Sequence, residues 1–137
     1  MVATEEKIAT GAKHVYLKDL HFEHRLWLNE LNFVRDEMSS LSKRLAEVEA
    51  KNTNTECQFF AESFQNRLIQ HEKVTAELKE EIKKHESSLA HFATEHPIAV
   101  DHVYFGDHKG FRDKMARFTA LYHPFKVEFM NFIAKWM

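Results

Sequence analysis

Histidine is the residue type in this sequence that is best suited to carry chemistry. Ten of the 137 residues are histidines, and neutral imidazole binds zinc, iron, copper or nickel, or transfers protons near pH 7. His21 and His24 are three residues apart, which puts both on one face of a helix. Whether they can form a metal or proton-transfer site depends on which other side chains the fold brings close to them.

Three apolar seams with alternating three- and four-residue spacing predict three long helices, at about residues 15–50, 54–95 and 107–136. His24, His85 and His108 lie on these seams, one in each helix. Residues 97–106 hold a proline and a glycine and are predicted to form a loop. Capping-box spacings at Thr53 with Glu56, or at Thr55 with Gln58, predict the start of the second helix.

The third seam is almost wholly aromatic and contains Pro124. A proline inside a helix removes a backbone hydrogen bond and crowds the preceding turn, so this helix is expected to be kinked or broken there. Short connections make neighbouring helices antiparallel. The prediction is therefore an all-α fold: an elongated antiparallel bundle of three long helices, forming a single domain over residues 1–137. Residues 2–16 or a kinked C-terminal segment would supply partial fourth-helix cover.

A register estimate decides which histidines can meet. If the two connections are centred near residues 52 and 99, His21 and His24 face residues 80–83, and His85 faces Asp113. This arrangement predicts a metal site near one end of the bundle. Its ligands would be His21, His24, His85 and Asp113, with His108 and Glu86 at the edge of the cluster. The expected ion is a divalent transition metal, zinc or iron.

The sequence also supports a purely structural role for these histidines. It has neither His-x-x-x-His nor the Glu-x-x-His of di-iron bundles. A seam histidine that packs in the core and hydrogen-bonds to an acid on the next helix explains the same pattern. His71 and His96 are assigned this packing role.

Composition restricts the partners and the compartment. The formal net charge is −2, which does not favour binding to nucleic acid or to an anionic membrane. No apolar run approaches the roughly 20 residues that span a bilayer, and the acidic N-terminal stretch is not expected to be a signal peptide. The only cysteine, Cys57, cannot form an intrachain disulfide, so a cytoplasmic location is expected.

Two functions are compatible with these patterns. The sustained heptads and a second apolar stripe formed by Phe22, Leu26 and Phe33 predict a non-enzymatic module that acts through protein–protein contact, as a homodimer. The alternative is a metal-binding bundle built on the histidine cluster. Phosphate-binding and nucleophile-elbow motifs are absent, which favours a protein without catalytic activity and leaves a catalytic metal centre as the open alternative.

Overall fold

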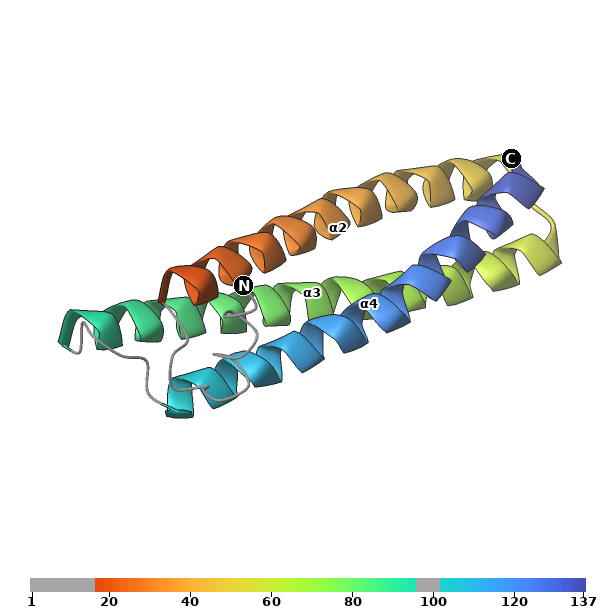
Figure 1. The fold of residues 1–137 in the computed structure, drawn as a ribbon. Coiled ribbons are helices and arrows are strands. Elements are labelled where there is room, and N and C mark those ends of the chain that lie inside the picture. The colour runs from red at the N-terminus through yellow and green to blue at the C-terminus, as the bar shows by residue number, and fades with distance from the viewer. Residues whose placement is uncertain (1–16, 96–101) are drawn as a thin grey trace. The chain divides into compact units, whose positions relative to one another are not determined.

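The computed structural model describes residues 17–95 and 102–137. Within these ranges it has three α-helices and no strand: α2 (Leu17–Lys51), α3 (Thr55–Glu95) and α4 (His102–Trp136). The predicted all-α fold of three long packed helices is confirmed (Figure 1). The cover that we expected from residues 2–16 lies outside the described residues. No helix in the described part of the chain has both the length and the apolar composition needed to cross a bilayer.

The third helix differs from the prediction at two places. α4 begins at His102, so residues 102–106 are helical and their assignment to a loop was wrong. A glycine in a helix costs only about 1 kcal/mol relative to alanine, and Gly106 does not prevent a helix that goes on to bury His108 completely. α4 also continues through Pro124, so of the two expected alternatives, a kink or a break, the break does not occur. Tyr122 and Phe125 are buried on either side of that proline, and their packing supports the helix across it. A kink at Pro124 stays a prediction.

Asparagines organise the connection between α2 and α3, which appears as a tight turn in Figure 1. Asn54 Oδ1 accepts hydrogen bonds from the backbone N–H groups of Glu56 and Cys57, at 2.8 and 3.1 Å. Asn54 is therefore the N-cap of α3, and the threonine capping boxes were wrong; asparagine is among the strongest N-cap residues. Asn52 Nδ2 donates to the carbonyl oxygens of Val48 and Trp136, at 2.8 and 2.9 Å.

The helices divide into two compact units. We call residues 17–29, 79–95 and 102–116 the histidine unit, and residues 30–78 and 117–137 the aromatic unit. Each unit contains a segment of all three helices. The assignment of residues 1–137 to a single domain stays a prediction.

The aromatic unit has a continuous apolar core. Arg67 pairs with Glu128 at 3.1 Å and Glu56 with Lys135 at 3.9 Å, so α3 and α4 run antiparallel here. The buried aliphatic residues of α2 and α3 pack against an aromatic face of α4. The buried residues of that face are Phe118, Tyr122, Phe125, Phe129 and Phe132.

The histidine unit continues the same seams but places polar rings in its core. Leu20 and Trp27 of α2, Ile82 and Leu89 of α3, and Met115 of α4 are all buried. Imidazoles occupy the seam positions between them. A core of this composition needs a hydrogen-bond or metal partner for each buried ring nitrogen.

Candidate metal centre

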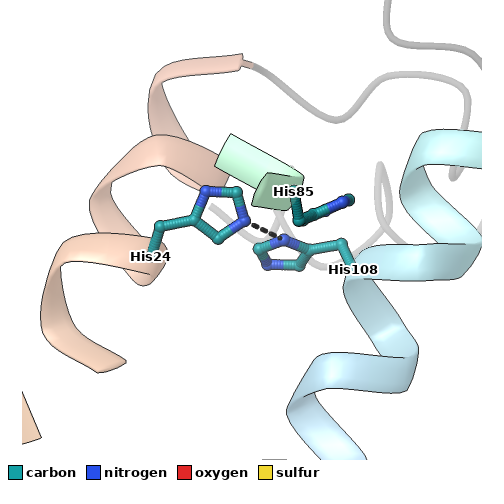
Figure 2. A group of neighbouring side chains, drawn as sticks. All are labelled: His24, His85 and His108. Atoms are coloured by element: carbon teal, nitrogen blue, oxygen red, sulfur yellow. Dashed lines mark hydrogen bonds between the residues drawn. The ribbon is translucent and has the colours of Figure 1, made fainter. Parts of the chain in front are cut away.

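Three histidines, one from each helix, meet in the histidine unit (Figure 2). His24 of α2, His85 of α3 and His108 of α4 are 0%, 7% and 0% exposed. Because each lies on the apolar seam of its helix, the packing that buries the seams also brings the rings together. Each ring offers one nitrogen, and the three nitrogens all lie within 4.8 Å of one another. The cluster thus supplies three converging donors of the kind that transition metals bind.

Two of the donors are already spaced like ligands of one ion. His24 Nε2 and His108 Nδ1 are 3.1 Å apart, along the dashed line in Figure 2. Two nitrogens bound to a tetrahedral zinc at ~2.0–2.1 Å are separated by roughly 3.3 Å. A nitrogen of His85, within 4.8 Å of both, would have to move by at most roughly 1.5 Å to join the same shell.

A carboxylate contacts the outer nitrogen of His24 and of His108, which is the ring nitrogen that faces away from the other histidine. Glu86 of α3 pairs with His24 Nδ1, and Glu23 of α2 lies 2.6 Å from His108 Nε2. Arg112 Nε in turn donates to Glu23 at 3.0 Å. Metal-bound histidines usually donate their second ring N–H to a carboxylate, which fixes the tautomer and the ring orientation. The contacts of Glu86 and Glu23 with the two rings have the same arrangement.

The charges of these groups determine where the ring protons lie. Burial raises the pKa of Glu86, but hydrogen bonds from His24 and His21 outweigh burial and leave that pKa lowered. An ionised carboxylate can only accept, so the Nδ1 of His24 carries a proton. Burial lowers the pKa of His108 to about 4, although the hydrogen bond to Glu23 opposes the shift. His108 is therefore neutral near pH 7, with its proton on Nε2 toward Glu23.

Aromatic rings restrict the histidines from the sides. Trp27, which is buried, stacks on His108 with ring centroids 4.8 Å apart. Phe111 lies 5.0 Å from His85, measured between ring centroids. These rings pack against His108 and His85 and limit how far the two imidazoles can turn.

The structure brings together two of the predicted ligands and one residue from the edge of the predicted cluster. His24 and His85 meet as expected. His108, which the register estimate put at the edge, is the third member of the cluster. Glu86, also put at the edge, contacts the ring of His24 from outside the group of converging nitrogens.

The other two predicted ligands lie elsewhere. The side chain of His21 is 53% exposed and contacts Glu86, so it supports the outer shell. Asp113 is exposed and does not belong to the group of converging donors. The reason is the register between α3 and α4: Glu81 pairs with Lys114, whereas the estimate placed residue 117 opposite it. Asp113 also lies two residues before the buried Met115, on the exposed side of α4.

Glu23 is the functional residue that sequence reasoning missed. It stands directly before His24, just as Glu86 stands directly after His85. On a helix, adjacent residues point about 100° apart, so neither acid can serve the histidine next to it. Each reaches a histidine of another helix instead. Four histidines of the sequence have a glutamate as direct neighbour: His24, His71, His85 and His96. This adjacency alone therefore could not single out Glu23.

Comparison with protein-family models, with curated proteins and with solved structures finds no match to this chain.

Proposed function

We propose that this protein binds a divalent transition-metal ion, zinc, through His24, His85 and His108. One observation carries the proposal: His24 Nε2 and His108 Nδ1 face each other at 3.1 Å while the outer nitrogen of each ring lies on a carboxylate. The two inner nitrogens share a hydrogen bond in a buried place. A divalent cation would replace the proton between them and bind both nitrogens, while the outer nitrogens keep their carboxylate partners.

The donor set favours zinc over iron. Non-haem iron sites typically use two histidines and one carboxylate. Here both nearby carboxylates, Glu23 and Glu86, are engaged with ring N–H groups of the histidines. An all-imidazole set of three is one that zinc accepts, with a fourth position left for another ligand.

A bound ion would act on stability. It would connect α2, α3 and α4 within the histidine unit, and an ion that binds only the folded state stabilises that state by about 2.7 kcal/mol at a free concentration of 100 times Kd. The function that we propose is accordingly a metal-binding helical module, without a catalytic activity assigned to it. The cytoplasm is the compartment that we propose, because the only cysteine of the sequence is free and buried.

Metal stoichiometry after equilibrium dialysis against zinc tests the proposal. The wild-type protein should retain one equivalent of zinc, and His24→Ala, His85→Ala and His108→Ala should each retain much less. His71→Ala is the matched control, because His71 lies in the aromatic unit and packs on Phe125. Equal zinc content in the wild type and in all three cluster variants would refute the proposal.

A second measurement separates metal binding from folding. Circular dichroism should show that the cluster variants remain helical. Zinc should raise the Tm of the wild type and of His71→Ala and leave the Tm of the cluster variants unchanged. A zinc-dependent rise in Tm that survives all three substitutions would place the metal elsewhere.

A homodimer is the second candidate function, and two exposed apolar residues favour it. Phe22 and Leu26 are 61% and 49% exposed, and they lie one turn apart on α2 in the histidine unit. Phe33, predicted to belong to the same stripe, is 64% exposed. Clustered exposed apolar side chains are typical of association surfaces. Sedimentation equilibrium should give a dimer for the wild type and a monomer for Phe22→Ser/Leu26→Ser; a monomeric wild type at high concentration would exclude this candidate.

A further inference from the structure

A pocket of about 520 Å³ adjoins the histidine cluster between α3 and α4 of the histidine unit. His85 belongs both to the lining of this pocket and to the group of three converging histidines. The pocket therefore reaches one member of the cluster directly. A ligand in the pocket would approach a bound ion from the side of His85.

Gly110 keeps this pocket wide. It lines the pocket in the interior of α4, where glycine is disfavoured relative to alanine. A Cβ added at Gly110 would meet nothing within 4 Å, so no neighbouring atom requires glycine there. The open space lies at the level of His85 and Phe111, which line the same pocket.

The charges around the pocket favour an anion. Lys84 and Lys114 line it together with one acid, Glu81, and Glu81 is paired with Lys114 at 3.1 Å. The Lys114 ammonium nitrogen also lies 5.0 Å from the ring centroid of Phe111, which places its charge beside the pocket wall. A divalent ion held by three imidazoles would add two positive charges, with the carboxylates of Glu86 and Glu23 on the outer side of His24 and His108.

We infer that the pocket beside His85 binds a small carboxylate, whose oxygen completes the coordination of an ion held by His24, His85 and His108. This inference rests on the proposed metal site. A tetrahedral ion with three protein ligands has one open position, and the pocket provides space and positive charge on one side of the cluster. The lysines attract the carboxylate, and Phe111 supports its apolar part.

Visible absorption of the Co²⁺-loaded protein tests the inference, because the d–d bands of Co²⁺ respond to a change of ligand. Titration with acetate should change these bands in a saturable way, and perchlorate at equal ionic strength should not. Gly110→Leu should abolish the acetate response with one Co²⁺ still bound, since its side chain would reach into the pocket beside His85. Gly110→Ala is the matched control and should respond like the wild type.

The lysines give a second, independent readout. Lys84→Ala should weaken the apparent affinity for acetate by up to about fivefold, the size expected of a partly exposed ion pair. Lys109→Ala, next to Gly110 but outside the pocket lining, should leave the affinity unchanged. Equal effects of the two substitutions would contradict a carboxylate in this pocket.

The outcomes separate this inference from the proposed function. A protein that binds no Co²⁺ refutes the metal site and the inference together. A protein that binds one Co²⁺ but whose bands do not respond to acetate refutes the inference alone. A response to acetate that Gly110→Leu leaves intact shows that the anion reaches the ion by another path, and this also overturns the inference.

Discussion

His24 Nε2 and His108 Nδ1 lie 3.1 Å apart in the histidine unit, although 84 residues separate them in the sequence. Each ring is oriented by an acid of a different helix: Glu86 of α3 contacts His24, and Glu23 of α2 contacts His108. The two contacts fix which nitrogen of each ring faces the other ring. The predictions below test the consequences of this arrangement and of the packing around it.

Neutralising the carboxylate that orients a histidine ring should weaken zinc binding without removing a metal ligand. Glu86→Gln and Glu23→Gln should each lower zinc affinity by about 10- to 100-fold, because the imidazole loses the carboxylate that fixes its tautomer and raises its basicity. Competition with a chromophoric chelator measures the affinity. Glu77→Gln, an exposed position on α3 in the aromatic unit, is the control and should bind like the wild type. Unchanged affinity in both test variants would mean that neither acid supports a metal ligand.

Trp27 should report metal binding directly. Its ring stacks on His108 at 4.8 Å, so a paramagnetic ion such as Cu²⁺ at the cluster should quench its fluorescence. The sequence has two tryptophans, and Trp136→Phe leaves Trp27 as the only one. In that background Cu²⁺ should quench emission at one equivalent, and adding His108→Ala should abolish the quenching. Quenching that persists in the double variant would locate the ion at another site.

His71 should make the protein less stable as the pH falls. Burial, reinforced by the nearby Arg67 charge, lowers the pKa of His71 below its usual 6.5. Between the unfolded pKa of about 6.5 and the lower folded pKa, His71 is protonated in the unfolded chain and neutral in the folded protein. Unfolding therefore takes up a proton in this pH range, and the free energy of unfolding decreases as the pH falls. Urea unfolding at pH 7.5 and pH 5 should show a larger loss for the wild type than for His71→Gln, with all other histidines common to both. An equal loss in the two proteins would exclude this contribution.

Gly110→Ala should stabilise the protein by about 0.5–1 kcal/mol. Glycine inside a helix costs about that much relative to alanine through backbone entropy, and the added Cβ would meet no atom within 4 Å. Denaturant unfolding of the metal-free protein measures the change. A destabilised Gly110→Ala would reveal a close contact at this position that the structure does not contain.

The helices could be predicted because their apolar seams are continuous. The seam positions from Leu31 to Val48 are all buried in the aromatic unit, as their three- and four-residue spacing requires. The start of α4 could not be predicted, because Gly106 and Gly110 interrupt the pattern with residues that usually mark loops. Packing of His108 and the residues after it outweighs their low helix propensity.

The candidate site could be predicted only as a neighbourhood. Sequence spacing identified His24 and His85, since both lie on seams. It could not fix the register between α3 and α4 to better than one turn, and this error put Asp113 where His108 belongs. It also missed Glu23, because a contact between helices depends on the rotation of each helix as well as on its register. Both quantities are set by side-chain packing and not by periodicity.

Because each helix contributes one histidine, the proposed site can form only late in folding. A chain in which only α2 and α3 have paired would hold two of the three nitrogens, and no pair of helices offers more. The third nitrogen must come from the remaining helix, so a three-coordinate ion requires all three helices to be docked. Closure of a long-range contact costs chain entropy before any binding energy is gained. Metal uptake by a refolding chain would therefore follow the docking of the last helix, and its time course would report on that step.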